Sequence, residues 1–319
     1  MSVRTEPKVF VITLNWDGRK WLGDCLSSIL AMDYPNFEVV MVDNGSTDGS
    51  VQFVHETFPG VHVVETGSNL GYARGFNAGL EFAAQNGAKY FLIMNNDTVI
   101  DRNALTALIE TMQNKPKAGF VTGKVYFYDR PNILQSVGKE EDPVVWSGNL
   151  IGFKEEDNGQ YDEVAERTFI DDVFTLVSRS LYDEVGGYDP QYYLQSEEFD
   201  LQVRAKKKGW KFYYTPKAKI RHRVSMSMGG IGNPVGRYFD TRSGMVVMAR
   251  HARFFKFARY YFYTGYKVTN SLLRGLAQLN MSKIKPRLTI WLGFVSGTLW
   301  LFHRRPAIGI PPLIRKLNK

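Results

Sequence analysis

Polar side chains follow three strand-like hydrophobic runs in the first hundred residues, at the point where each run stops. Asn15-Trp16-Asp17 follows the run FVITL, Asp43-Asn44-Gly45-Ser46 follows FEVVMV, and Asn95-Asn96-Asp97 follows YFLIM. Such nearly continuous hydrophobic runs are typical of parallel strands that are covered on both faces. Ligands of open α/β sheets bind beyond the carboxyl ends of the strands. We therefore expect the three polar segments to converge on one site.

The acid Asp43 comes directly after its strand, which predicts a carboxylate that points into the crevice. A carboxylate can accept a hydrogen bond from the ring N–H of a pyrimidine base. A helix N-cap at Thr47 or Asp48 explains the later acid of this segment but not Asp43. Asp43 is therefore a candidate for binding the base of a nucleotide.

Asp97 occupies the corresponding place after the fourth strand. From there it could hold a divalent cation that bridges the protein to a diphosphate. A turn formed by Asn95-Asn96-Asp97 before a helix is an adequate alternative, and only the position at a third convergent strand end favours the metal site.

Three acids, Glu197, Glu198 and Asp200, fall in the first turn of a predicted helix that begins near Ser196. Acids at a helix N-terminus are stabilised by the helix dipole, which is the structural alternative. Three carboxylates in four positions repel one another, however, and we expect each to raise the pKa of the others. A carboxylate with a raised pKa suits a general base, which favours a catalytic function for this turn.

Two basic residues are further candidates. Arg74 lies near the start of a predicted helix in the segment NLGYARGFNAGL, and it could bind a diphosphate. Glycines at every fourth position of this segment predict close packing of the helix, and the segment lacks the G-x-G-x-x-G of nicotinamide enzymes. His222 ends a strand after the acidic helix, where a neutral imidazole could ligate a metal, although an isolated histidine is more often structural.

Short strands and helices must position these residues, and they alternate as in a parallel α/β sheet. The expected strands are 9–14, 37–42, 61–65 and 90–94, and the expected helices are 21–30, 50–58 and 72–84. Residues 118–170 are broken by prolines and glycines, which predicts a loop-rich region that shapes the acceptor side. Order is expected to return with the run 169–178, a helix near Ser196 and a strand at 212–215, and the chain after about 237 looks helical to its end.

Charge divides the chain into two unlike parts. Residues 1–203 hold 15 Lys and Arg against 31 Asp and Glu, whereas residues 204–319 hold 25 against one, Asp240. A basic region of this kind implies phosphates as partners, on nucleic acid, on lipid headgroups or on a substrate. The single cysteine, Cys25, fits a helix core and excludes a disulfide framework, and the N-terminus does not resemble a signal peptide. Both features fit the cytoplasm.

Together these motifs resemble glycosyltransferase family 2, in particular its bacterial rhamnosyltransferase-like branch. The resemblance runs from residue 9 to about 255 and rests on an ordered set of segments: ITLNWDG, VVMVDNGSTDGS, NLGYARGFNAGL, MNNDT, DDVFTLVSRSLYDEVGGYDPQYY, SEEFDLQVRAKKKGW, RHRVSMSMGG and YFDTRSGMVVMARHAR. It implies a GT-A fold, which is a mostly parallel sheet flanked by helices with a Rossmann-like nucleotide-binding half and an acceptor half. We expect a catalytic domain over 1–236, divided near 117, and a basic, aromatic helical region over 237–319.

The resemblance also implies roles for individual residues. Glu198 is expected as the catalytic base, Asp97 and His222 at the metal, and Glu197 and Asp200 in support of the acceptor or of the helix start. The nucleotide-sugar is expected to contact Asn15, Trp16, Asp43, Arg74, Asn95, Asn96 and Arg204. Three positions depart from the family pattern: Asn95 replaces the first acid of D-x-D, Glu198 stands where Asp is more frequent, and Trp16 replaces a tyrosine.

The expected activity is a metal-dependent, inverting transfer of a sugar from a dTDP- or UDP-sugar to an acceptor hydroxyl, with Mg²⁺ or Mn²⁺ as cofactor. Rhamnose from dTDP-rhamnose is the first expectation, by resemblance alone, and the acceptor would be a glycan of the cell envelope that could be linked to a lipid diphosphate. A catalytically inactive scaffold of the same fold and a basic nucleic-acid-binding protein are the alternatives. Carboxylates at the strand ends and in the 196–200 turn argue against both, so we expect no nucleic acid partner.

The uncharged stretch Leu288–Phe302 is too short to span a bilayer comfortably, because a helix of this length measures roughly 22 Å against about 30 Å of hydrocarbon. One interpretation is a buried helix that packs on the catalytic domain. The preferred one is attachment to the cytoplasmic face of the membrane, because aromatic residues alternate with basic ones over residues 253–267. An anionic membrane surface is therefore an expected partner.

Overall fold

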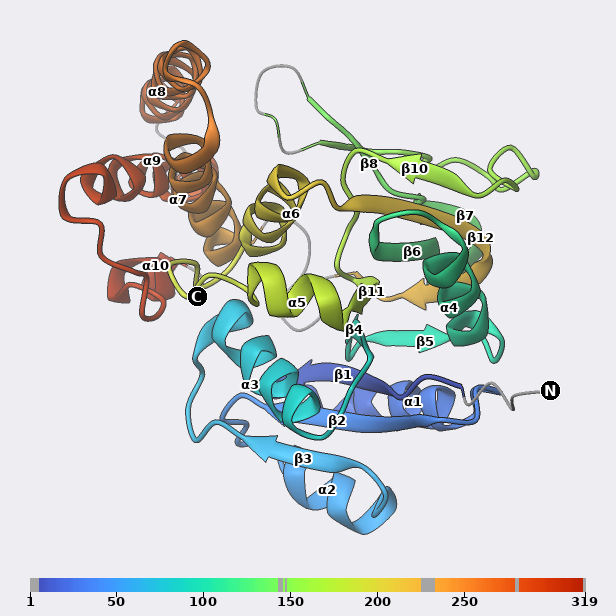
Figure 1. Ribbon diagram of the computed structural model, residues 1–319. Helices are drawn as coiled ribbons and strands as arrows, with labels where there is room; N and C mark the ends of the chain where they lie inside the picture. The colour runs from blue at the N-terminus through green and yellow to red at the C-terminus, as the bar shows by residue number, and fades with distance from the viewer. Residues whose placement is uncertain (1–5, 143–145, 147, 225–232, 279–280, 318–319) are drawn as a thin grey trace.

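Strands and helices alternate through the first hundred residues almost as the hydrophobic pattern predicts (Figure 1). The structure is a computed structural model, and it describes residues 6–142, 146, 148–224, 233–278 and 281–317. The first elements are β1 (Val9–Asn15), α1 (Arg19–Leu30), β2 (Phe37–Asp43), α2 (Ser50–Thr57), β3 (His62–Glu65), α3 (Gly71–Gln85), β4 (Tyr90–Asn95), β5 (Thr98–Ile100) and α4 (Ala104–Asn114). The expected strands and helices of this part are confirmed to within one or two residues at their ends.

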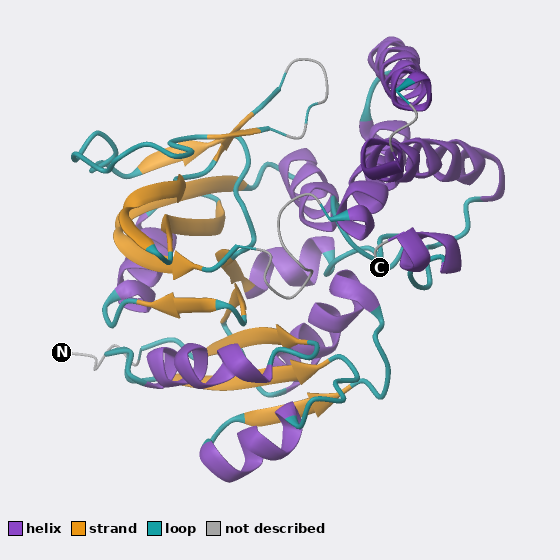
Figure 2. Cartoon of the chain, turned by 180° about the vertical axis from the view of Figure 1, so that it is seen from behind, coloured by secondary structure: helices purple, strands orange, loops and turns teal. Residues whose placement is uncertain are grey.

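One mixed sheet of ten strands runs through the molecule, and its central path has the order β10-β12-β6-β11-β4-β1-β2-β3. The part formed by β4, β1, β2 and β3 is parallel, β11 is antiparallel to both of its neighbours, and β12 is parallel to β6. Helices cover both faces (Figure 2). This is the mostly parallel, helix-flanked sheet of a GT-A fold.

The register of the parallel strands aligns their carboxyl ends. Asn15 of β1 lies opposite Asp43 of β2, and Leu14 lies opposite Asn95 of β4. The polar segments that follow the strands therefore begin at the same edge of the sheet, as the sequence predicts.

The glycines of α3 allow this helix to approach the sheet closely. A Cβ atom at Gly75 would lie 2.6 Å from Leu14 Cδ1, and one at Gly79 would lie 2.5 Å from Ile12 Cγ2. Both distances are too short for a real contact, so larger residues would push α3 away from β1. The packing role expected for these glycines is confirmed.

The region 118–170 is more regular than expected: its described residues supply five strands, and about half of these residues lie in loops and turns. The strands are β6 (Ala118–Phe127), β7 (Arg130–Ser136), β8 (Lys139–Glu140), β9 (Asn149–Leu150) and β10 (Ala165–Arg167). Every residue of β6 is buried, but Gly123 and Lys124 interrupt its hydrophobic pattern. Gly123 is needed because a Cβ there would collide with the carbonyl of Ala218. Buried Lys124 is neutralised by Asp157 and Asp162 of the segment between β9 and β10.

The remaining elements carry the acidic turn and the C-terminal region. They are β11 (Phe174–Ser178), α5 (Arg179–Val185), α6 (Glu197–Lys207), β12 (Lys211–His222), α7 (Pro234–His251), α8 (Phe254–Ala277), α9 (Met281–His303) and α10 (Pro312–Leu317). Strand β12 is much longer than expected. The expected domain boundary at 236 lies inside α7.

Helix α9 packs against α7, so the uncharged stretch 288–302 is a packed helix. A Cβ at Gly293 would lie 2.4 Å from the Tyr238 carbonyl oxygen, and one at Gly297 would lie 2.7 Å from Met245 Cβ. Trp300 is 3% exposed and donates a hydrogen bond to Gln191 of the catalytic part. Within the described residues, no helix has both the length and the apolar character needed to cross a membrane.

Candidate functional site

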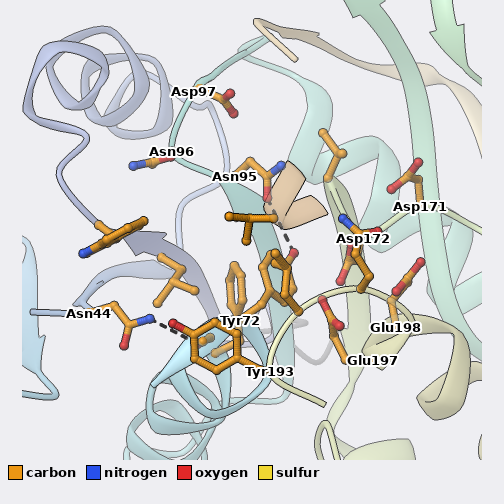
Figure 3. A pocket seen from close by; sticks show the side chains of 18 of the residues that line it. Asn44, Tyr72, Asn95, Asn96, Asp97, Asp171, Asp172, Tyr193, Glu197 and Glu198 are labelled. Carbon is orange, nitrogen blue, oxygen red and sulfur yellow. Dashed lines mark hydrogen bonds between the residues drawn. The ribbon is translucent and has the colours of Figure 1, made fainter. Parts of the chain in front are cut away.

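A cavity of about 610 Å³ opens at the carboxyl ends of β1, β2 and β4 and extends to the start of α6. Figure 3 shows Asn95 and Asn96 on one side of this cavity and Asp171, Asp172, Glu197 and Glu198 on the other. The cavity thus brings together the strand-end residues and the acidic turn, which are about one hundred residues apart in the sequence. Trp16, Asp97 and His222 also line it.

Asn15 and Asp43 hold the strand ends in place rather than line the cavity. Asn15 Nδ2 donates to Asp43 Oδ1 at 3.2 Å, and Asn96 Nδ2 donates to Asn15 Oδ1 at 2.8 Å. Asp43 Oδ2 accepts from the backbone N–H groups of Gly45 and Ser46. Asp43 is 2% exposed, and its carboxylate holds the turn in shape. A base could therefore donate a hydrogen bond only to Oδ1, which accepts from a single group among the described residues.

Asp97 and His222 form a buried pair beside Asn95 and Asn96, at 2% and 4% exposure. His222 Nε2 lies 3.2 Å from Asp97 Oδ1, but it is not aligned for a hydrogen bond and has no hydrogen-bond partner among the described residues. His222 Nδ1 contacts Gln135 Oε1 at 2.8 Å, and because an amide oxygen only accepts, the proton sits on Nδ1. A neutral imidazole with its proton on Nδ1 would have the lone pair of Nε2 available for a metal ion, as in a ligand oriented by a second residue.

This pair fits a divalent cation that is shared with a ligand. Among the described residues, no group of three His, Cys, Asp or Glu side chains is placed to hold a metal without help. A cation that keeps several waters and bridges one or two protein ligands to substrate phosphates needs no more than such a pair.

Glu198 lines the cavity beside a half-buried cation, Lys139. Lys139 Nζ lies 3.4 Å from Glu198 Oε1 and 3.7 Å from Asp171 Oδ2. Burial by itself would lower the pKa of Lys139, but the charges of Asp171 and Glu198 outweigh it and raise the pKa. Lys139 therefore stays charged and balances part of the negative charge of this wall.

Two other acids of the same wall have raised pKa values. Burial, with added repulsion from Glu198, raises the pKa of both Glu197 and Asp172. Glu197 Oε2 is buried without a hydrogen-bond partner among the described residues, and Asp172 Oδ2 accepts from Tyr188 Oη at 3.1 Å. A carboxyl group whose pKa is raised in this way can keep its proton and donate a hydrogen bond.

Asp200 and Arg204 lie outside the described lining of the cavity and form a buried hub behind it. Burial would raise the pKa of Asp200, but a hydrogen bond from His251 and the charge of Arg204 lower it to about 2. The expectation that all three acids of the turn raise one another's pKa is therefore wrong for Asp200. Arg204 donates to Asp200, to the Val185 carbonyl and to the Gly187 carbonyl at 2.6–2.8 Å, which leaves its guanidinium committed to the fold rather than to a diphosphate.

We predict that Asp200→Asn destabilises the protein, because it leaves Arg204 and Arg250 without their buried anion. A carboxylate whose pKa falls from 3.8 to about 2 on folding stabilises by roughly 2 kcal/mol above pH 4. This contribution is lost as the pH falls through 2. Urea unfolding at pH 7 and pH 3 should show a smaller difference between wild type and variant at pH 3, and a constant difference would contradict the hub.

Arg74 is half-buried on α3 and is not part of the described lining either. The sequence did not single out Gln135, Lys139, Asp171 or Asp172, all of which line the cavity. The pair Asp171-Asp172 directly before the apolar run of β11 is a usable signal in the sequence, whereas Gln135 and Lys139 lie in the region whose prolines and glycines predict loops. Residues 225–230 of the segment RHRVSMSMGG lie outside the described residues.

Comparisons with known proteins agree with this architecture. Residues 8–186 match the family described as Glycosyl transferase family 2. The chain is 29% identical over 241 residues to the N-acetylglucosaminyl-diphospho-decaprenol L-rhamnosyltransferase of Mycobacterium tuberculosis, with 69% of this chain and 77% of that protein covered. It is 27% identical over 211 residues to the poly-beta-1,6-N-acetyl-D-glucosamine synthase of Staphylococcus epidermidis, with 65% of this chain but only 48% of that relative covered.

Two solved structures share the fold. The mannosyltransferase PcManGT from Pyrobaculum calidifontis, in complex with GDP-Man and Mn²⁺, has a TM-score of 0.57 and 16% identity, with 95% of this chain and 89% of that chain covered. S. aureus TarS 1-349 has a TM-score of 0.53 and 14% identity, with 97% and 83% covered.

Proposed function

The chain belongs to glycosyltransferase family 2, and we propose that it transfers a sugar from a nucleotide-sugar to an acceptor hydroxyl in one displacement, with inversion at the anomeric carbon. The observation that carries this proposal is one cavity whose lining includes both Glu198 and the Asp97–His222 pair. A base on one wall and an anchor for a leaving diphosphate on the other are what such a displacement requires.

Glu198 is the proposed catalytic base. Its carboxylate takes the proton of the acceptor hydroxyl, whose oxygen then attacks the anomeric carbon as the bond to the diphosphate breaks. Lys139 beside it balances the charge of the acidic wall, and Glu197, with its raised pKa, is placed to contact the acceptor.

Asp97 and His222 are the proposed protein ligands of Mg²⁺ or Mn²⁺, with Gln135 fixing the imidazole. The cation supplies charge that stabilises the departing diphosphate. Asn95 and Asn96 lie beside this pair, and their amides can contact the donor. Trp16, 38% exposed at the rim, can stack on the base while Asn15 and Asp43 shape the pocket for it. Arg74 of α3 is a further proposed contact of the diphosphate.

Rhamnose from dTDP-rhamnose is the proposed donor, supported by the mycobacterial relative, which is a rhamnosyltransferase. A thermal-shift screen of nucleotide-sugars with Mg²⁺ or Mn²⁺ tests it, because a ligand that binds only the native state raises apparent stability. We expect the largest shift with dTDP-rhamnose. A larger shift with a UDP-sugar would contradict dTDP-rhamnose as the donor but would still support sugar transfer as the activity.

The same relative acts on a lipid-linked sugar, as its name states, which supports a lipid-diphosphate-linked glycan acceptor and a location at the cytoplasmic face of a membrane. Helix α8 projects from the rest of the molecule (Figure 1) and exposes Phe254, Phe255 and Phe262 by 75%, 85% and 72%. Aromatic side chains that alternate with cations on one helix are typical of attachment to anionic membrane surfaces.

We predict that the protein sediments with anionic liposomes at low salt and is released as salt rises. Because α9 packs on α7, the test keeps the chain whole and uses Phe254→Ser with Phe255→Ser. This double variant should stay largely in the supernatant, whereas Leu30→Ser, which removes an exposed leucine on α1, should sediment like wild type. Equal sedimentation of all three proteins would rule out α8 as the attachment surface.

A further inference from the structure

A second cavity, of about 350 Å³, lies between α7, α9 and the segment 303–312. Ile310 lines both this cavity and the one that holds Glu198, so the two are neighbours. Its lining includes five residues that can donate hydrogen bonds through their side chains: Tyr238, Arg242, Ser296, His303 and Arg305. We call it the Arg242 cavity.

Arg242 is a buried cation that has no carboxylate partner within the part of the chain that the structure describes. Its side chain is 4% exposed, and Nη1 is buried with no hydrogen-bond partner among the described residues. Nη2 donates only a long hydrogen bond, 3.4 Å, to the carbonyl oxygen of Arg305. Burial of an uncompensated charge is costly, so a buried guanidinium that lines a cavity points to an anionic ligand.

The neighbouring groups have donors to spare. His303 Nδ1 accepts from the backbone N–H of Arg305 at 2.9 Å, which leaves the ring proton on Nε2 for another acceptor. Ser296 Oγ accepts from Tyr238 Oη at 2.8 Å, so its own hydrogen can be donated elsewhere. The described lining contains no acid, and the sequence has none after Asp240.

We propose that the Arg242 cavity binds a phosphate or diphosphate group. Several donors around a guanidinium suit a ligand with many acceptor oxygens, and arginine binds phosphate with paired N–H groups. Since the cavity adjoins the one with Glu198, the diphosphate of a lipid-linked acceptor is the source that its position favours. This assignment of the source rests on the proposed function, whereas the phosphate site itself does not.

The first experiment measures binding of inorganic pyrophosphate by titration calorimetry in EDTA, which removes cation-dependent binding near Asp97. Arg242→Gln should weaken binding roughly tenfold or more, because it removes a charge-assisted contact. Arg305→Gln changes an exposed residue of the same lining and should weaken it as well, even if Arg242→Gln does not fold. Arg274→Gln, an exposed arginine of α8 outside the described lining, is the matched control and should bind like wild type. Equal affinity in wild type and Arg305→Gln would overturn the proposal.

The second experiment separates the two sources of phosphate. The KM values of wild type and Arg305→Gln are measured for two acceptors: a sugar on a lipid diphosphate and the same sugar on an uncharged alkyl chain. If the variant raises the KM for the diphosphate acceptor alone, the cavity binds the diphosphate of the acceptor. If it leaves both KM values unchanged but weakens pyrophosphate binding, the cavity binds free phosphate, and the acceptor assignment is overturned. Failure of the proposed function would appear separately, as the absence of nucleotide-sugar binding and transfer in wild type.

Discussion

Glu198→Gln should remove most of the sugar transfer while it preserves the fold and donor binding. The amide keeps the shape and the neighbours of the carboxylate but cannot accept the proton of the acceptor hydroxyl. Loss of general-base catalysis typically costs on the order of 10²–10⁴-fold in rate. The measurement is kcat with the identified donor and acceptor, together with donor affinity and the midpoint of thermal unfolding.

Glu197→Gln is the matched control, because it makes the same change at the adjacent position. The raised pKa of Glu197 favours its protonated form near neutral pH, and an amide resembles a protonated acid. We therefore expect a much smaller loss of kcat. If Glu197→Gln caused the larger loss, the base would be Glu197, and near-normal turnover of both variants would remove this wall from the proton transfer.

Asp97→Ala should weaken donor binding only when a divalent cation is present. Asp97 and His222 are the two proposed protein ligands of the cation, and the Asp97 carboxylate lies 3.2 Å from His222 Nε2. The substitution therefore removes one of the two ligands. Even loss of an outer partner of a metal site costs about 10–100-fold in metal affinity, and loss of a ligand should cost at least that. Donor affinity is measured by calorimetry with Mn²⁺ and again with EDTA.

Gln135→Leu gives the complementary control, because it leaves both proposed ligands in place and removes only the group that orients His222. Its donor affinity should fall with Mn²⁺ and match that of wild type in EDTA. Donor binding that is equally strong with and without EDTA in wild type would show that Asp97 and His222 act in the fold alone.

The sequence was sufficient to predict the strand ends because their signal is local. Each buried strand is a continuous hydrophobic run that ends at a polar residue. Because these strands are parallel neighbours in the sheet, the polar residues at their carboxyl ends lie at the same edge. The pairing of Asn15 with Asp43 and with Asn96 follows from that order.

The roles of Asp200 and Arg204 could not be predicted in the same way, because they depend on distant partners. Asp200 has the same place in the acidic turn as its neighbours, but His251 and Arg250 reach it from a helix about fifty residues later. The sequence shows that three carboxylates of this turn repel one another, but it does not show that cations of α7 neutralise one of them. Lys139 was missed for the same reason, since its partners Asp171 and Glu198 are far from it in the sequence.

The hub around Asp200 limits how this protein can be recombined with its relatives. Helix α6 carries both Glu198 and Asp200, and Asp200 pairs with Arg250 and His251 in the last turn of α7. The buried charge of the catalytic part is therefore neutralised by residues of the C-terminal helices. A chimera joined before Arg250 would import a foreign helix end opposite a buried carboxylate. Junctions placed between α7 and α8, at Ala252 or Arg253, keep the balance intact and are the better points at which to exchange C-terminal segments.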